Sequence, residues 1–173
     1  YVANALKNNI LKINLAGAIS TLAGTGAIGF QDGPGTTATF YFPNSVAVDA
    51  MNNIYVSDGV NNLIRKITPD GTVSTLAGSG KAGADDGTGA TAAFNGPAGL
   101  AVDVAGNIYV ADSNNNLIRK ITQGGVVTTV AGSGRSGSRN GQAGGRRNPK
   151  VIKAAYRPKV RGCYKKKRQV QKS

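Results

Sequence analysis

The sequence predicts an all-β fold, a partial β-propeller of four-stranded antiparallel blades. Three observations predict it. Residues 43–89 and 97–143 agree at 26 of 47 positions when they are aligned at an offset of 54 residues, so the chain contains an internal repeat. Each copy holds several β-type runs separated by turn signals. Twenty-five glycines, 40% apolar residues and few aromatic residues are typical of a β-rich chain with many tight turns.

Each copy of the repeat contains four predicted strands. In the first full copy we expect them at residues 45–49, 54–58, 63–68 and 72–78, where Val, Ile, Tyr and Thr dominate. Met51-Asn52-Asn53 and Pro69-Asp70-Gly71 supply hairpin turns. Four such strands form a meander that is too small to bury both of its faces. Stacking successive copies around an axis buries these faces, as in a β-propeller.

The repeats also predict how the chain is divided. Tyr1-Val2-Ala3-Asn4 matches Tyr55-Val56-Ser57-Asp58, so the chain opens in the middle of a repeat and without a methionine. We therefore expect a fragment of a longer array, with about two and a half blades. The predicted units are a partial blade with its crossing (1–42), two blades (43–96 and 97–143) and, where the similarity ends, a separate tail (144–173).

Two long crossings connect the predicted blades, at residues 25–42 and 79–96. Each carries an Asp-Gly-Xaa-Gly step followed, a few residues later, by a phenylalanine, Phe40 or Phe94. We expect each phenylalanine to fill the space between neighbouring blades.

The net charge of +13 comes almost entirely from the tail. Residues 1–143 hold nine Lys and Arg against eight Asp, whereas residues 144–173 hold twelve Lys and Arg and no acid. Such a segment buries too little apolar surface to offset the entropy of ordering, so we expect it to be disordered. A functional interpretation is that its cations contact polyanions, foremost Lys165, Lys166, Lys167 and Arg168. The favoured interpretation is a solvated charge run without a fixed partner, or the product of a shifted reading frame or a fusion.

The repeated motifs resemble those of the NHL-repeat β-propellers, in particular bacterial extracellular-type arrays. The resemblance covers residues 1–143 and is strongest over 97–134, with Pro-Ala-Gly-Leu-Ala-Val-Asp, Gly-Asn-Ile-Tyr-Val-Ala-Asp and Asn-Leu-Ile-Arg-Lys. It implies six-bladed rings, an extracellular or cell-envelope setting, and a face that in some members binds RNA or proteins. The leucines at positions 63 and 117 depart from the arginine or histidine of many members.

Charged residues that recur in every copy are first explained by the fold. Asp49, Asp58, Asp103 and Asp112 each end a predicted strand, where a carboxylate can cap the following turn. The favoured interpretation of the recurring arginines is pairing with a repeat aspartate. The alternative is a basic, partner-binding surface formed by Arg65, Lys66, Arg119 and Lys120.

No single-copy catalytic set stands out in the sequence. The chain contains no histidine, which removes the usual general base and the commonest metal ligand. We expect no cofactor, and calcium is the one metal ion left open. No stretch is apolar enough to predict a transmembrane helix.

The sequence thus predicts a non-enzymatic propeller scaffold that binds a protein or carbohydrate partner, and whose exposed end blades self-associate to complete a ring. Two alternatives are a fragment of a calcium-dependent propeller hydrolase or lyase, and an RNA-binding propeller.

Overall fold

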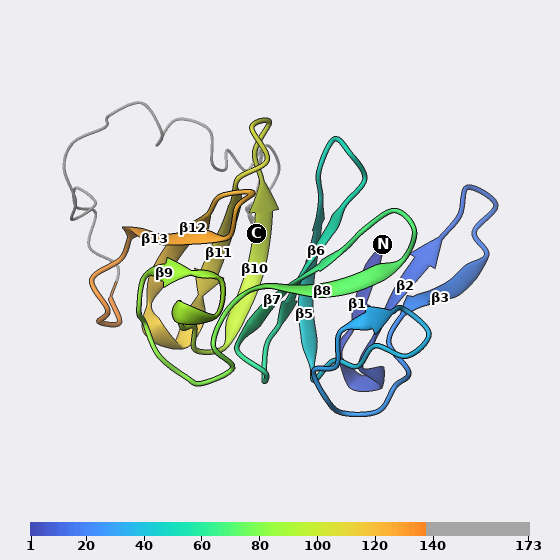
Figure 1. Ribbon diagram of the computed structural model, residues 1–173, viewed down its shortest axis with the longest axis horizontal. Helices are drawn as coiled ribbons and strands as arrows, with labels where there is room; N and C mark the ends of the chain where they lie inside the picture. Colours follow the sequence, from blue (N-terminus) through green and yellow to red (C-terminus); the bar gives the residue numbers. More distant parts are fainter. Residues whose placement is uncertain (138–173) are drawn as a thin grey trace, which may run out of the picture.

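The computed structural model describes residues 1–137, which form three antiparallel sheets placed one after another around a common axis (Figure 1). The first sheet contains β1 (Val2–Asn4), β2 (Asn9–Ile13) and β3 (Ile19–Ala23). The predicted tail, residues 144–173, lies outside the described residues. None of the helices in the described part is long and apolar enough to cross a membrane.

The second and third sheets are full four-stranded meanders, as the repeats predict. The second contains β5 (Pro43–Val48), β6 (Ile54–Asp58), β7 (Leu63–Ile67) and β8 (Thr72–Ala77). The third contains β10 (Pro97–Val102), β11 (Ile108–Asp112), β12 (Leu117–Ile121) and β13 (Val126–Ala131). The all-β propeller prediction is confirmed, and the predicted strand ends are shifted by no more than two residues.

Each full blade also carries a fifth, two-residue strand that the sequence did not predict. β4 (Gly33–Pro34) pairs with β8, and β9 (Gly87–Thr88) pairs with β13. Both lie in the crossings, so each crossing runs along the outer edge of the blade that it enters. Three short 3-10 helices complete the described part: η1 (Ala5–Lys7), η2 (Gly89–Thr91) and η3 (Ser113–Asn115).

The hydrophobic cores lie between blades. Phe40 is fully buried between Ile10 and Ala23 of the first sheet and Ile54, Val56, Ile67 and Val73 of the second. Phe94 occupies the same place between the second and third sheets. Both phenylalanines therefore fill the space between blades, as predicted, and each junction buries a continuous apolar cluster.

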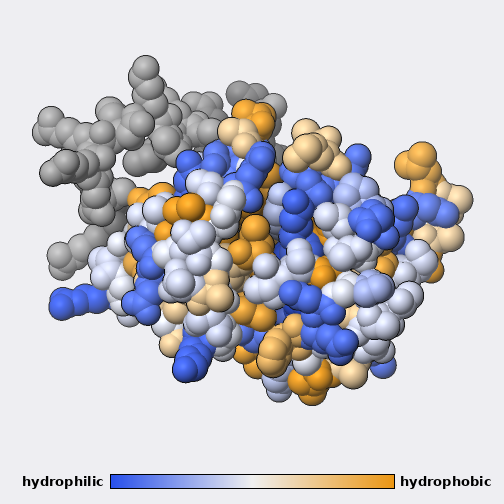
Figure 2. Space-filling view, viewed as in Figure 1, coloured by the Kyte–Doolittle hydropathy of each residue, from blue (hydrophilic) through white to orange (hydrophobic). Residues whose placement is uncertain are grey.

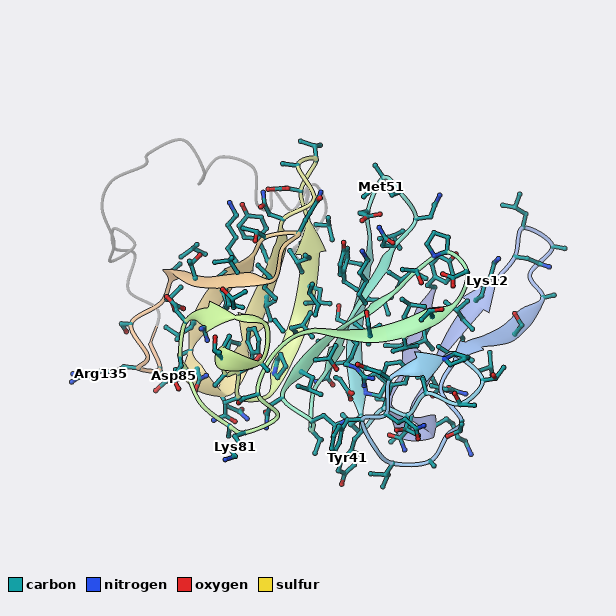
Figure 3. The ribbon with its side chains drawn as sticks, viewed as in Figure 1. Lys12, Tyr41, Met51, Lys81, Asp85 and Arg135 are labelled. Carbon is teal, nitrogen blue, oxygen red and sulfur yellow. The ribbon has the colours of Figure 1, made fainter. Side chains whose placement is uncertain are left out.

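The strands end at two opposite rims. One rim, which we call the hairpin face, carries the β5–β6 and β10–β11 turns, and Met51 lies on it in Figure 3. The other, the crossing face, carries the crossings and the turns after β6 and β11. Figure 3 places Tyr41 and Lys81 at this rim.

Candidate functional site

The two arginines proposed for a partner-binding surface lie inside the molecule. The side chains of Arg65 and Arg119 are 0% exposed, so neither guanidinium group can meet a partner, and this part of the surface prediction is wrong. The physical reason is that carboxylate and backbone carbonyl oxygens inside the molecule accept the hydrogen bonds of each guanidinium group. The favoured interpretation, in which each arginine pairs with a repeat aspartate, is the one that the structure bears out.

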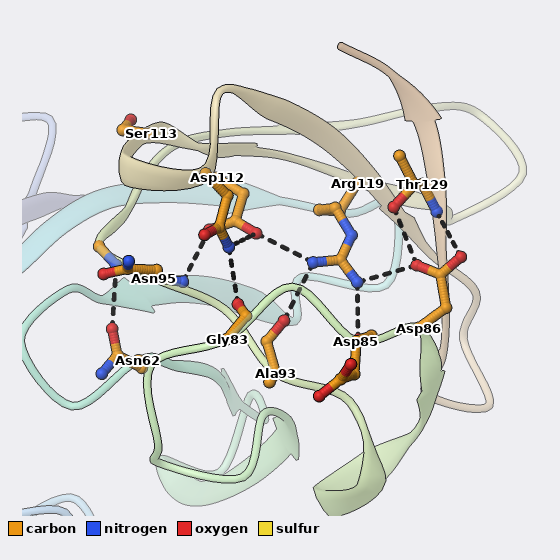
Figure 4. Close-up of polar contacts among 12 residues, drawn as sticks. Asn62, Gly83, Asp85, Asp86, Ala93, Asn95, Asp112, Ser113, Arg119 and Thr129 are labelled. Atoms are coloured by element: carbon orange, nitrogen blue, oxygen red, sulfur yellow. Dashed lines mark hydrogen bonds and ion pairs between the residues drawn. The ribbon is translucent and has the colours of Figure 1, made fainter. Parts of the chain in front are cut away.

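Each arginine holds a crossing against its blade, and Figure 4 shows the contacts of Arg119. Arg119 Nη1 donates to Asp112 Oδ2 at 2.9 Å and to the carbonyl of Ala93 at 3.0 Å. Its Nη2 donates to Asp86 Oδ1 at 2.8 Å and to the carbonyl of Asp85 at 2.7 Å. The Cζ atom lies 5.2 Å from the centre of the Phe94 ring, within the range of a cation–π contact.

Arg65 makes the same contacts one blade earlier. It pairs with Asp58 at 2.9 Å and with Asp32 at 2.6 Å, and its Cζ lies 5.2 Å from the Phe40 ring. Asp32 also accepts hydrogen bonds from the backbone and hydroxyl of Thr75 in β8. A buried charge is tolerated when it is paired, and the Nη atoms of each arginine pair with two carboxylates, so these arginines are structural.

Lys66 and Lys120 lie beside the repeat tyrosines, Lys66 on the face towards the third blade and Lys120 on the face of the third blade that points away from the second. Lys66 is in register with Tyr55, and Lys120 with Tyr109, and both lysines are half-buried. The structure therefore does not bring the four predicted residues together as one exposed surface. The predicted polyanion contacts Lys165 to Arg168 lie outside the described residues and stay a prediction.

The aspartates that end the inner strands close the hairpins. Asp49 Oδ1 accepts from the backbone N–H groups of Met51 and Asn53, and Oδ2 accepts from the Asn53 amide and the Tyr55 hydroxyl. Burial acts to raise the pKa of Asp49, but these hydrogen bonds together lower it. Burial, followed by Asp49, raises the pKa of Tyr55 to about 12. Asp103 repeats the arrangement with Asn107 and Tyr109.

These repeated carboxylates already accept hydrogen bonds from residues of their own turns and blades. Among residues 1–137 no group of three or more His, Cys, Asp or Glu side chains is arranged to hold a metal ion. This part of the chain therefore contains no such ligand set for the calcium ion that the hydrolase or lyase alternative requires.

The repeats diverge most clearly on the crossing face, at the junction of the first and second blades. Five large apolar side chains are exposed there, and we call them the apolar patch: Leu6 (84%), Ile28 (64%), Phe30 (68%), Phe42 (41%) and Val60 (50%). At an offset of 54 the corresponding residues of the next junction are Val60, Ala82, Ala84, Gly96 and Asn114. Figure 2 shows hydrophobic residues gathered along this lower rim, where Figure 3 places Tyr41.

Hydrogen bonds join the segments that carry the apolar patch. The backbone N–H of Phe42 donates to Asn8 Oδ1 at 2.9 Å, and that of Val60 donates to the Tyr41 carbonyl at 3.2 Å. The Asn61 amide donates to the carbonyl of Gly29 at 2.7 Å. The patch is thus held by the turns of two blades and by the crossing between them.

Phe42 adopts a backbone conformation that suits glycine. Its φ is +54°, and the equivalent Gly96 has φ +60°. A bulky residue in this left-handed region is an outlier that costs about 1–2 kcal/mol. Gly96 has a local reason to be glycine, because a Cβ there would lie 2.5 Å from Asn114 Nδ2. Val60 replaces that asparagine at the first junction, so the two positions differ together.

A hollow of about 480 Å³ adjoins the apolar patch on the crossing face. Its lining includes Phe30, Val60 and Leu63, Asn61 and Thr75, and the Gly78–Lys81 segment of the next crossing. Sequence reasoning missed this site. The available signal was the set of positions at which the two junctions differ. Where one copy of the repeat has a large apolar residue at an exposed position and the other copy does not, the fold does not require that apolar residue.

The comparisons with known proteins agree with the repeat architecture. The NHL repeat family model matches residues 40–67 and 94–121. Protein SUPPRESSOR OF QUENCHING 1, chloroplastic, from Arabidopsis thaliana is 36% identical over 131 residues, which are 70% of this chain and 12% of the relative. NHL repeat-containing protein 2 from Homo sapiens is 35% identical over 111 residues, which are 62% of this chain and 15% of the relative.

A solved structure shares the blade arrangement. An auxiliary nutrient binding protein from Bacteroides thetaiotaomicron superposes with a TM-score of 0.60 at 25% identity, over 72% of this chain and 33% of that chain. The chain therefore spans a small part of the curated relatives and about a third of this structural neighbour. The repeats, the interblade cores and these matches together show that the chain belongs to the NHL-repeat family of β-propellers.

Proposed function

We propose that this chain is a non-enzymatic propeller scaffold that binds a protein or carbohydrate partner through the apolar patch on its crossing face. One observation carries the proposal: the two junctions have nearly the same interior but differ at exposed positions, where the first has large apolar side chains and the second has mostly alanine, glycine and asparagine. Exposed apolar side chains that are grouped, rather than scattered, mark interaction sites.

The state of the polar residues supports a binding role over catalysis. Seven of the eight aspartates accept hydrogen bonds through their side chains from neighbouring residues, and the chain has no histidine to act as a general base. Fixed carboxylates of this kind hold turns and crossings in place. The calcium-dependent hydrolase or lyase stays an alternative for the whole protein.

The structural neighbour also supports a binding role, since the Bacteroides thetaiotaomicron protein is described as an auxiliary nutrient binding protein. The resemblance to bacterial extracellular-type arrays supports the further proposal that this chain works outside the cell or in the cell envelope.

A matched variant tests the proposal. Phe30→Ala, Phe42→Gly and Val60→Asn together replace part of the apolar patch with the residues that the second junction carries. The full chain and this repeat-matched variant are used in parallel to select from a random peptide phage library and to probe a glycan array. We expect binders that the wild-type chain retains and the variant loses, because the variant removes exposed apolar anchors but no core residue.

The reverse change is the control for position. Ala84→Phe, Asp85→Gln, Gly96→Phe and Asn114→Val rebuild the patch at the second junction. For any binder found, we expect the stoichiometry measured by calorimetry to rise from one to two. If the wild-type chain and the repeat-matched variant retain the same binders, in the peptide library and on the glycan array alike, the proposed function is overturned.

A further inference from the structure

We propose that the partner of the apolar patch is an acidic peptide segment, with a bulky apolar side chain that enters the hollow and carboxylates that meet Lys81 in its lining and Lys7 beside Leu6. This inference rests on the proposed function and names the class of ligand for the same site. It depends on three features of the crossing face: the hydrocarbon character of the patch, the occupied hydrogen-bonding groups around it, and the sign of the free charges.

The patch offers hydrocarbon surface in several shapes. Leu6, Ile28 and Val60 are aliphatic, and Phe30 and Phe42 add two aromatic rings, all at least 41% exposed. Phe30 and Val60 continue into the hollow, where buried Leu63 forms part of the wall. A groove of this kind suits apolar side chains of a peptide, which gain by leaving water.

The amides around the patch are already used. Asn61 Nδ2 donates to both Gly29 O and Asp58 Oδ2. Asn8 receives the Phe42 N–H and donates to the carbonyl of Gly26. Asn62 makes the equivalent pair of contacts with Gly96 and Gly80. A carbohydrate site needs free polar groups for the sugar hydroxyls, so these engaged amides favour a peptide over a sugar.

Two exposed cations belong to the segments that carry the apolar patch or line its hollow. Lys81 lines the hollow and is exposed, and Lys7 directly follows Leu6 and is also exposed. Neither lysine takes part in an ion pair within residues 1–137. Gln31 stands where the second junction has exposed Asp85, and the nearby Asp32 and Asp58 are both paired with Arg65. Carboxylates on a ligand would therefore meet Lys81 and Lys7, and on the first crossing they would meet Gln31 in place of the exposed acid that the next crossing carries.

Fluorescein-labelled peptide pools of about twelve residues provide the probe. The acidic–apolar pool combines Asp and Glu with Leu, Phe and Met. In one control pool Lys and Arg replace the acids, and in the other Ser and Gln replace the apolar residues. Binding to the full chain is measured by fluorescence anisotropy at about 0.15 M salt, where exposed charges more than about 8 Å apart are largely screened.

We expect the acidic–apolar pool to bind best, and about tenfold more weakly to the Phe30→Ala, Phe42→Gly, Val60→Asn variant, as for the loss of a hot spot. Lys7→Glu with Lys81→Glu should weaken binding and reduce its salt dependence. The basic tail is present in every variant, so a difference between variants reports on the patch. The graft at the second junction should restore binding to the repeat-matched variant.

Each outcome has a defined reading. Equal binding of the basic–apolar pool, or no effect of the lysine reversals, overturns the acidic peptide. Patch-dependent binding of oligosaccharides alone overturns this inference and leaves the proposed function standing. If neither peptide pools nor oligosaccharides distinguish the wild-type chain from the repeat-matched variant, both proposals fail.

Discussion

The junction between the first and second blades and the junction between the second and third are almost the same inside and different outside. Inside, each has an arginine that is 2.9 Å from one aspartate and 5.2 Å from the centre of a phenylalanine ring. On the crossing face, the positions of Phe30 and Phe42 at the first junction correspond to those of Ala84 and Gly96 at the second. The difference teaches that packing and charge pairing fix the interior, whereas the surface of each junction is free to acquire its own chemistry.

The first blade extends this comparison. At the positions of Arg65 and Asp58, it carries Leu11 and Asn4. Both charges are therefore missing together, rather than one at a time. A single buried charge without its partner is strongly unfavourable, while a neutral pair is not, so arginine and aspartate behave as one unit.

The largest expected effect comes from breaking this unit. Arg119→Leu leaves Asp112, which is 0% exposed, without its cation, and should lower the free energy of unfolding by about 3–5 kcal/mol. Asp112→Asn should also lower the free energy of unfolding, because it leaves Asp86 as the single carboxylate partner of the buried Arg119. The double variant copies the Asn4 and Leu11 pair of the first blade and should recover most of the loss. Urea unfolding of the four chains gives the coupling free energy, and additive losses would contradict the idea of a unit.

The next effect concerns the uncovered faces of the end blades. Three apolar residues on the outer face of the first blade are exposed: Val2 (42%), Ile13 (47%) and Ile19 (66%). Their counterparts in the second blade, Val56, Ile67 and Val73, lie in the core and are at most 1% exposed. Exposed repeat faces of this kind associate when no neighbour covers them. We expect the 173-residue chain to self-associate with rising concentration, in line with the prediction of ring completion.

Sedimentation velocity over an approximately hundredfold concentration range checks this expectation by mass action. Ile13→Lys with Ile19→Lys should shift the chain to monomer. Val104→Lys, at a fully exposed turn of the hairpin face, is the control and should leave association unchanged. A strictly monomeric wild-type chain would contradict the prediction.

A smaller effect of opposite sign is expected at the two equivalent positions of the crossing face. Phe42→Gly should raise the free energy of unfolding by about 1 kcal/mol, because glycine adopts the φ of +54° without the steric cost of a side chain. Gly96→Ala should lower it, because the new Cβ meets Asn114. Thermal unfolding followed by circular dichroism separates the two signs. If Phe42→Gly lowers stability, the phenylalanine serves the fold and the argument for a functional patch is weakened.

The sequence predicted most of the fold because alternation, turn residues and a 54-residue repeat are local signals. The strands, the Asp49 turn and the placement of Phe40 and Phe94 all follow from such signals and are confirmed. β4 and β9 were missed, since two residues are too few to show alternation, and with them the outer half of each arginine network, Asp32 and Asp86.

The apolar patch could not be predicted in the same way. It is assembled from segments near residues 6, 28–30, 42 and 60, which are far apart in the sequence, and nothing local indicates that they share one face. The position-by-position difference between the repeats contained the signal, but only the structure shows that those differences are exposed and adjacent.

The smallest expected effect appears only at high pH and compares Tyr55 with Tyr109. The pKa of Tyr55 is raised to about 12 by burial and by Asp49, against about 10 in an unfolded chain. Its contribution to stability is therefore complete below pH 10. As the pH rises from about 10 to 12, the unfolded chain loses this proton before the folded chain does, and the free energy of unfolding falls. Tyr55→Phe removes this term, so the difference in urea midpoint between the wild-type chain and the variant should shrink between pH 9 and pH 11.5.

Tyr109, whose pKa is also raised but which is half-exposed on the third blade, should show a weaker trend when changed to phenylalanine. Equal trends at the two tyrosines would mean that burial by the next blade does not set the difference, and that the hydrogen bond to the turn aspartate alone does.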